Sequence, residues 1–480
     1  MIGDLKPYPA YKDSGVPWLG EVPEHWGIKR NKLFLREVQG RSEEGTEELL
    51  TVSQYTGVSR RRERLRADNS LLTNAASLVG YKKVEAGDLV INIMLAWNGS
   101  LGVSPISGIV SPAYCVFRFQ DEVNPNFFHY LLRTPLFKGV FKTVSTGVVD
   151  SRLRLYPDDF LRLPSLLPPV KEQAAIATFL DHADRRIRRY IRSKQKLIKL
   201  LEEQKQVVIN QAVTRGLDPN VPLKPSGIEW LGDIPQHWEI WQIGHFAKVG
   251  NGSTPSRSNL DYWQGGKYPW LNSSSVNQGE ITTANQFVTN LAFKECHLPV
   301  VSSGSILMAI TGQGKTRGTA ALLSIEATIN QHIAYITPKK PVVRSNYLKS
   351  FLSAAYPELR RLSEASGSTK GALTCWDVSH FKVPVPPIGE QEKIEEDLKQ
   401  STQKSNAAIE RLNNEIVLFR EFRTRLIADV VTGKLDVREA AAHLPKELDE
   451  TEPFEDDLPD PELDPDTDSD LEAVAEDEAA

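Results

Sequence analysis

Two stretches of the chain have the apolar spacing of long helices. Residues 172–215 and 390–432 contain neither glycine nor proline, so each is able to run as a helix for about 40 residues, or roughly 60 Å. In the first stretch, apolar residues recur at alternating steps of about four and three: Ile176, Leu180, Ala183, Ile187, Tyr190, Leu197, Leu201 and Val208. The second stretch has the same pattern at Ile409, Leu412, Ile416, Phe419 and Leu426. A long helix with one apolar stripe needs a partner helix, so the pattern predicts that the two helices pair.

The segments that precede the two long helices have a different pattern. Each contains about 140 residues, with short β-type runs such as 87–92 and 304–309 between turns rich in Gly, Ser and Asn. A PPxxEQ sequence, at Pro168–Gln173 and again at Pro386–Gln391, joins each segment to its helix. The pattern therefore predicts an α+β protein with two such units.

The two units are copies of one another. Ser14–Trp26 (SGVPWLGEVPEHW) and Ser226–Trp238 (SGIEWLGDIPQHW) are identical at eight of thirteen positions, at an offset of 212. The PPxxEQ junctions recur at an offset of 218, and so do the Val-Thr and Leu-Asp pairs within 213–218 and 431–436. Three ordered matches indicate an internal duplication.

Connectivity predicts how the repeats are arranged. The first helix carries the chain away from the first unit, and a short linker near 214–225 starts the second unit, from which the second helix runs back. We therefore expect an antiparallel coiled coil with a pseudo-twofold axis and one globular unit at each end. Since Ser226–Trp238 follows the end of the first helix, Ser14–Trp26 should pack on the end of the second, near 431–436, with Trp18 and Trp26 buried there.

The opening segment, the PPxxEQ junctions and the duplication resemble the specificity (S) subunits of type I restriction–modification enzymes. The resemblance spans roughly residues 8–436. Further segments that look like this family are Gly87–Met94, Ala96–Gly99, Gly108–Tyr114, Thr254-Pro255, Tyr262-Trp263 and Pro269-Trp270.

The resemblance implies a noncatalytic protein in which each unit is a target recognition domain that reads one half of a bipartite, asymmetric DNA site. The long helices would fix the gap between the half-sites and dock two methyltransferase (M) subunits, to which restriction/translocase (R) subunits are added. S-adenosylmethionine, ATP and Mg²⁺ would belong to those partners, and none of these cofactors to this chain.

These features divide the chain into consecutive parts. We expect a repeat segment at 1–26, target recognition domain 1 at 27–167, a spacer helix at 168–215, a linker with the second repeat segment at 216–238, target recognition domain 2 at 239–385, the distal spacer helix at 386–436 and an acidic disordered tail at 437–480.

Charge is distributed unevenly along the chain. The net charge is −5, but residues 447–480 hold 17 acidic and no basic residues, which leaves 57 basic against 45 acidic residues, or +12, on 1–446. Such a body suits a polyanion, and double-stranded DNA is the expected partner. We expect the tail to favour solubility, or else to mimic the charge of DNA.

Composition also bears on location. The chain has no apolar run of membrane-spanning length and no signal sequence at its beginning, and its three cysteines (Cys115, Cys296 and Cys375) lie far apart. We expect a cytoplasmic, prokaryotic protein without a membrane segment or a metal site.

Candidate DNA contacts come from basic and small polar residues. The first cluster is Arg60, Arg61, Arg62 and Arg64, which suits phosphates or guanine edges but is also typical of a solvated charged face. The small polar loops before the PPxxEQ junctions contribute Thr146 in the first unit and Ser368, Thr369 and Lys370 in the second, where an ordinary turn is the alternative.

Residues 309–316 (AITGQGKT) fit the pattern of a phosphate-binding loop, but a β-like run follows where such a loop needs a helix. We therefore prefer a DNA-facing loop that offers Gln313, Lys315 and Arg317, with a surface turn as the alternative. The first long helix has a basic face of Arg185, Arg189, Arg192 and Lys196, which suits the DNA gap, a partner subunit or solvent.

Motifs for catalysis are missing from the sequence. It contains no Asn-Pro-Pro-aromatic or Phe-x-Gly-x-Gly methyltransferase motif, no nuclease Pro-Asp with Glu-x-Lys, and no HExxH. Two other classes stay open: the targeting half of a single-chain methyltransferase or nuclease, and a coiled-coil scaffold with no role on DNA.

Overall fold

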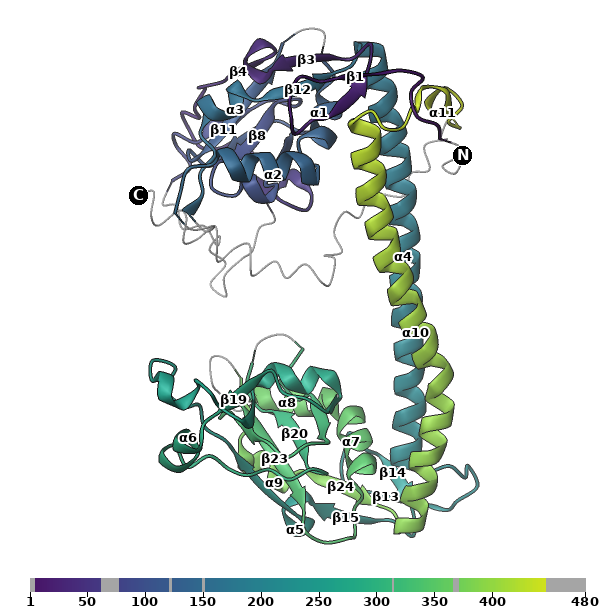
Figure 1. Ribbon diagram of the computed structural model, residues 1–480. Helices are drawn as coiled ribbons and strands as arrows, with labels where there is room; N and C mark the ends of the chain where they lie inside the picture. Colours follow the sequence, from purple (N-terminus) through teal and green to yellow (C-terminus); the bar gives the residue numbers. More distant parts are fainter. Residues whose placement is uncertain are drawn as a thin grey trace. The chain divides into compact units, whose positions relative to one another are not determined.

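The computed structural model describes residues 5–61, 77–120, 123–148, 152–312, 315–365 and 371–445 (Figure 1). The chain forms two compact units: the first comprises Met1–Ser193 and Glu415–Ala480, and the second Lys194–Asn414. The second unit is therefore one continuous stretch, whereas the first is assembled from both ends of the chain. Among the described residues, no helix combines the length and apolar character needed to cross a bilayer.

The first unit is built on an antiparallel sheet with the strand order β4–β11–β8–β9. These strands are β4 (Leu35–Glu37), β8 (Leu89–Asn92), β9 (Leu101–Val103) and β11 (Tyr114–Phe119). All four residues of β8 are buried, because this apolar run has packed layers on both faces.

Four two-stranded ladders and three helices surround this sheet. The ladders are β1 (Tyr11–Asp13) with β2 (Glu21–Pro23), β3 (Gly27–Arg30) with β12 (Pro164–Leu167), β5 (Leu50–Ser53) with β6 (Gly57–Arg60), and β7 (Lys82–Val84) with β10 (Gly108–Val110). The helices are α1 (Pro125–Leu131), α2 (Pro135–Val144) and α3 (Pro157–Arg162). Each helix begins with proline, whose fixed φ and missing N–H suit a first helical turn.

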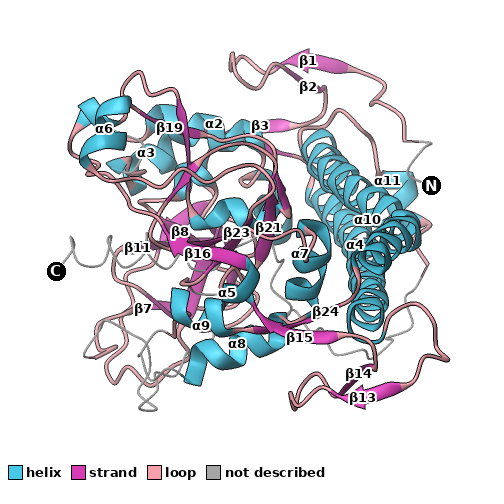
Figure 2. Cartoon of the chain, turned by 90° about the horizontal axis from the view of Figure 1, so that it is seen from below, coloured by secondary structure: helices cyan, strands magenta, loops and turns pink. Residues whose placement is uncertain are grey.

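The second unit repeats this order of elements. Its sheet has the order β16–β23–β20–β21–β18, formed by Ala247–Asn251, Ile333–Pro338, Ile306–Ala309, Ala320–Leu323 and Glu280–Ile281. The helices α7 (Ser345–Ala354), α8 (Tyr356–Ala365) and α9 (Cys375–His380) follow in the places of α1, α2 and α3. Figures 1 and 2 both show α7 beside the long helices, and its residues Tyr347 and Phe351 share a core with Val213.

The remaining strands of the second unit form three small sheets. They are β13 (Leu223–Pro225) with β14 (Asp233–Pro235), β15 (Glu239–Gln242) with β24 (Lys382–Val385), and β19 (Gln286–Val288), β17 (Tyr268–Leu271) and β22 (Thr328–Ile329). Two short helices, α5 (Ile243–Phe246) and α6 (Asn290–Glu295), complete this unit.

The two long helices are α4 (Val170–Arg215) and α10 (Ile388–Val431), within two residues of the uninterrupted stretches 172–215 and 390–432. The distal spacer helix, predicted to extend to residue 436, ends five residues earlier, at Val431. In the first unit, Asp184 forms an ion pair with Arg423, and Tyr190 stacks on Phe419 with ring centroids 6.0 Å apart. From the first contact to the second, the residue number rises from 184 to 190 along α4 and falls from 423 to 419 along α10. The two helices are therefore antiparallel, as predicted. In the second unit, Lys205 of α4 donates to Asn406 of α10 over 3.1 Å.

The predicted apolar stripe is buried over only part of α4. Ile176, Leu180, Ala183 and Ile187 are buried in the core of the first unit. Leu197, predicted to belong to the same stripe, is 45% exposed. The reason is that a two-helix pair covers a narrow seam, whereas the first turns of α4 also pack against the globular unit.

The expected start of the acidic tail at residue 437 is wrong. Val437 is fully buried in the core of the first unit, and Leu444 packs against that core. A short helix, α11 (Arg438–Ala442), lies between these two residues. Residues 446–480, which contain the acidic run, lie outside the described residues.

Candidate nucleic-acid interface

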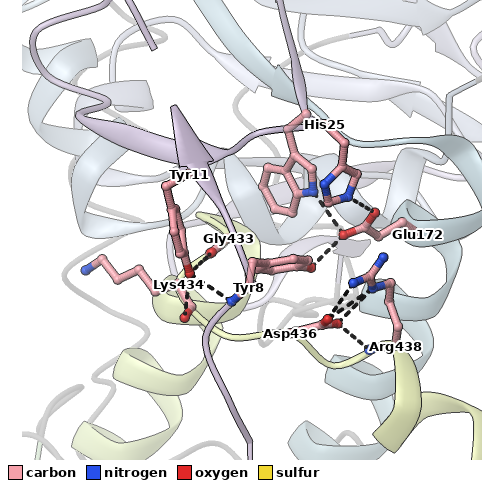
Figure 3. Close-up of polar contacts among 9 residues, drawn as sticks. Tyr8, Tyr11, His25, Glu172, Gly433, Lys434, Asp436 and Arg438 are labelled. Carbon is pink, nitrogen blue, oxygen red and sulfur yellow. Dashed lines mark hydrogen bonds and ion pairs between the residues drawn. The ribbon is translucent and has the colours of Figure 1, made fainter. Parts of the chain in front are cut away.

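The opening repeat segment is held by one carboxylate of α4 (Figure 3). Glu172, in the first turn of α4, accepts hydrogen bonds from the Tyr8 hydroxyl over 2.6 Å and from Trp26 Nε1 over 2.9 Å. His25 Nε2 lies 2.7 Å from the second oxygen of the same carboxylate. Trp26 is fully buried and Glu172 is 5% exposed, so these donors replace the water that this charge loses on folding.

The second unit contains the same joint. Glu390, in the first turn of α10, accepts from Trp238 Nε1 over 3.1 Å, and His237 Nε2 lies 2.7 Å from its other oxygen. The side chain of Glu390 is 25% exposed. The His-Trp pair that ends each repeat segment therefore binds the glutamate of the PPxxEQ sequence that ends the same unit.

The glutamine of each PPxxEQ sequence also has a fixed role. Gln173 donates to the Pro168 carbonyl over 2.7 Å and accepts from the Asn124 N–H over 2.8 Å. Gln391 repeats both bonds, donating to the Pro386 carbonyl and accepting from the Arg344 N–H, each over 2.8 Å. Each glutamine thus ties the beginning of its long helix to the residue before α1 or α7.

The opening segment also packs on the end of α10. The Tyr11 hydroxyl donates to the Gly433 carbonyl over 3.1 Å, and the Asp436 N–H donates to the Lys6 carbonyl over 2.8 Å. Gly433 has a φ of 79°, and a Cβ there would lie only 3.1 Å from the Trp26 ring. This is the contact that the offset between the repeats predicts for Trp26. Trp18, predicted to be buried at the same place, is only partly buried and lies edge-on to the Phe137 ring of α2, with ring centroids 5.3 Å apart.

Ionisation supports the same contacts. Burial and the hydrogen bond to Glu172 raise the pKa of the Tyr8 hydroxyl, which therefore keeps its proton and donates. Burial acts to raise the pKa of Asp436, but hydrogen bonds from Arg438 outweigh it and lower that pKa. The Asp436 carboxylate lies 2.6 Å from the Arg438 guanidinium, beside the Tyr8 ring (Figure 3).

The predicted arginine cluster of the first unit begins at the end of β6. Arg60 is largely exposed and lies 3.0 Å from Glu48, while the Arg61 backbone pairs with Leu49. Arg62 and Arg64 lie outside the described residues. Thr146, also predicted, is exposed and pairs through its backbone with Arg154.

Helix α1 fixes the hairpin that carries Arg60. Arg133, which follows α1, donates to the carbonyls of Leu101 over 2.6 Å and of Tyr55 over 2.9 Å. His129 Nδ1 accepts from the Val103 N–H over 3.2 Å. Burial and the nearby guanidinium of Arg133 lower the pKa of His129 to about 3, so this ring is neutral at physiological pH.

In the second unit the structure corrects one predicted contact. Arg317 is only 6% exposed, and its guanidinium donates to the Gly371 carbonyl over 2.9 Å and lies 3.3 Å from Glu364. It therefore holds the protein together rather than facing outward. Lys315, on the same loop, is exposed. Gln313, Ser368, Thr369 and Lys370 lie outside the described residues.

The loop that carries Lys315 runs from β20 to β21. Because it joins two strands, it does not present the helix N-terminus on which a phosphate-binding loop depends. The β-type run predicted to follow residues 309–316 is therefore present, as β21 (Ala320–Leu323). Across the described ranges, no three His, Cys, Asp or Glu side chains are grouped so as to hold a metal ion.

The predicted basic face of α4 is exposed. Arg185, Arg189 and Arg192 are exposed within the first unit, and Lys196 is exposed within the second. Their neighbour Arg188 instead lies 2.8 Å from Asp184, the residue that also pairs with Arg423.

Two copies of one α+β unit, each closing on the first turn of a long helix, define a modular protein with an internal duplication. Comparison with known proteins identifies one of its domains: residues 235–418 match the type I restriction modification DNA specificity domain. Over these residues the chain contains the DNA specificity domain of type I restriction–modification enzymes, and over longer stretches it is similar to their specificity subunits.

Relatives extend this likeness along the chain. A putative type I restriction enzyme MjaX specificity subunit from Methanocaldococcus jannaschii is 26% identical over 322 residues, covering 66% of this chain and 70% of the relative. The MjaVIII specificity subunit of the same organism is 22% identical over 433 residues, covering 87% and 94%. A chain from a solved type I restriction–modification system has the same fold, with a TM-score of 0.60 at 18% identity, covering 86% of this chain and 99% of that one.

We predict that Glu172→Gln destabilises the first unit by about 1–3 kcal/mol, because the bonds from Tyr8 and Trp26 would lose their charged acceptor and the amide nitrogen would face His25 Nε2. Urea unfolding followed by tryptophan fluorescence measures this change. Glu390→Gln is the matched control, and we expect a smaller effect there because Glu390 is more exposed. An unchanged unfolding midpoint for Glu172→Gln would show that the carboxylate does not hold the segment.

A second prediction concerns pH. The folded pKa of His129 is about 3, below the ordinary 6.5, so the unfolded chain binds this proton first as the pH falls. The contribution of His129 to stability is therefore complete above pH 6.5 and is lost progressively towards pH 3. His129→Asn keeps an acceptor but does not titrate, so the variant should lose less stability than wild type between pH 7 and pH 4. Urea titrations at the two pH values measure the free energy of unfolding of both proteins. An equal loss of stability in wild type and in His129→Asn would contradict this account.

Proposed function

We propose that this chain directs a type I restriction–modification enzyme to a bipartite DNA site, with each unit reading one half-site. The observation that carries the proposal is the duplication: one unit contains most of the matched DNA specificity domain, and the other repeats its order of elements and its Glu–His–Trp joint. A protein with two such units has two reading surfaces, and the half-sites differ because the exposed loops of the units differ in sequence.

Catalysis belongs to partner subunits in this proposal. The similarity to type I specificity subunits supports methyltransferase and restriction subunits as partners, and we propose that two methyltransferase copies dock, one for each repeat. S-adenosylmethionine, ATP and Mg²⁺ then bind to those partners. The exposed arginines of α4 suit either an acidic partner surface or the DNA between the half-sites.

The proposal separates cleanly from its two competitors, a single-chain enzyme and a scaffold with no role on DNA. We expect the purified chain to lack methyltransferase, nuclease and ATPase activity, and to confer adenine methylation at a split site once its methyltransferase partner is added. Gel shifts on random-sequence DNA, with and without that partner, test binding directly. Turnover of S-adenosylmethionine by the chain alone would favour the single-chain enzyme, and no DNA binding in either state would favour the scaffold.

We also predict that the half-sites are exchanged independently. Replacing residues 27–167 with those of a relative should change one half of the methylated sequence, because that segment forms the globular part of the first unit only. Mapping of methylated adenines in genomic DNA reads the outcome. The reciprocal control, replacement of residues 239–385, should change the other half, and a change in both halves from one replacement would defeat the two-module proposal.

A further inference from the structure

Four side chains of the second unit form a continuous row of hydrogen bonds at the end of its sheet. The Thr254 hydroxyl donates to Gln331 Oε1 over 2.5 Å, and Gln331 Nε2 lies 3.2 Å from His332 Nε2. His332 Nδ1 lies 2.6 Å from the Thr311 hydroxyl oxygen. We call Thr254, Gln331, His332 and Thr311 the Gln331 row. Gln331 and His332 are exposed, and the two threonines are partly exposed.

The backbone beneath the row is fixed from several directions. The N–H groups of Gly252 and Ser253 donate to the carbonyls of Asn330 and Ile329, over 3.2 Å and 3.0 Å. A Cβ at position 252 would collide with the Ile329 carbonyl, so only glycine permits this approach. On the other side, the His332 carbonyl accepts from the Ile310 N–H over 2.9 Å.

Two indoles hold the segment that continues from Thr254. Trp270 Nε1 donates to the Ser253 carbonyl over 3.1 Å, and Trp263 Nε1 donates to the Ser256 carbonyl over 3.0 Å. The next residue, Arg257, is exposed, and its guanidinium lies 3.8 Å from the centroid of the Trp263 ring. Arg257 also donates to Gln286 over 2.7 Å, so the cation is oriented before any ligand arrives.

Some polar hydrogens of the row are not used within it, and the order of donors and acceptors determines which ones these are. With Gln331 Nε2 donating to His332 Nε2, the ring proton lies on Nδ1 and is donated to Thr311. The Thr311 hydroxyl proton and the second amide proton of Gln331 are then not used within the row. An amide and hydroxyls both donate and accept, as base edges do, whereas phosphates only accept. Positive charge is supplied by Arg257, three residues after Thr254, and by the exposed Lys315, four residues after Thr311.

We propose that the Gln331 row, flanked by Arg257, contacts the bases of the half-site read by the second unit. The inference rests on the proposed function. It assigns direct readout to Thr254, Gln331 and His332, which lie outside the loops that sequence patterns indicate, and to Thr311, which lies within the 309–316 loop. Oriented side chains suit this task, because a preordered donor loses little entropy on binding. A glutamine in such a position pairs with adenine at N6 and N7, and a correct pair contributes about 5- to 150-fold of discrimination.

The test is selection from a pool of duplexes with randomised bases, using the full chain in complex with its methyltransferase. Wild type should enrich two half-sites with a fixed gap. Gln331→Ala should relax one or two positions of one half-site by about tenfold or more and leave the other half-site unchanged. Thr311→Val, which keeps the shape of the side chain and removes its hydroxyl, should relax the same half-site. Gln236→Ala, at an exposed glutamine elsewhere in the second unit, should match wild type.

The outcomes separate this inference from the proposal beneath it. If wild type enriches no half-sites, the proposed function fails. If wild type enriches both and Gln331→Ala and Thr311→Val match it, the inference alone is wrong. It is also wrong if Gln331→Ala weakens binding to all sequences equally, since that result assigns the row to phosphates. Thermal unfolding of each variant confirms that the second unit is intact.

Discussion

The fold depends on a carboxylate in the first turn of each long helix that accepts an indole N–H. Glu172 and Glu390 are each the third residue of their helix, where the helix dipole favours negative charge. Each carboxylate binds a tryptophan that is fully buried, so the charge and the large apolar ring stabilise the same joint. The joint orients the repeat segment, and through it the first strand of the unit that follows.

A shared joint allows the exposed surfaces of the two units to differ. In the first unit, Arg133 fixes a hairpin that ends at Arg60, and in the second unit indoles fix a segment that presents Thr254 and Arg257. These contacts lie away from the helix ends, so the sequence of each surface is able to change without weakening the joint. This separation of duties is what a protein with two independent targets requires.

Sequence patterns predicted the architecture well, but they misplaced one of the candidate contact residues. The long helices, their antiparallel pairing and the position of Trp26 follow from periodicity and from repeat offsets, which are properties of the backbone. Arg317 was predicted to face DNA, yet it is buried against Gly371, because charge alone does not reveal whether a guanidinium has partners. The Gln331 row joins residues up to 78 positions apart (Thr254 to Gln331 alone spans 77), and no local pattern indicates such a contact. The recurrence of His-Trp and Glu-Gln in both repeats was the one available signal for the joints.

The composition of the first unit has a consequence for the order of folding during synthesis. Its core includes Trp26 and Phe128 from the beginning of the chain, and Val430 and Val437 from near the other end. The ribosome therefore completes the second unit, which ends at Asn414, before the last core residues of the first unit exist. Until residue 437 emerges, the apolar surface around Trp26 lacks its partners and is exposed to chaperones or to other nascent chains. The half of the protein that is made first is the half that matures last.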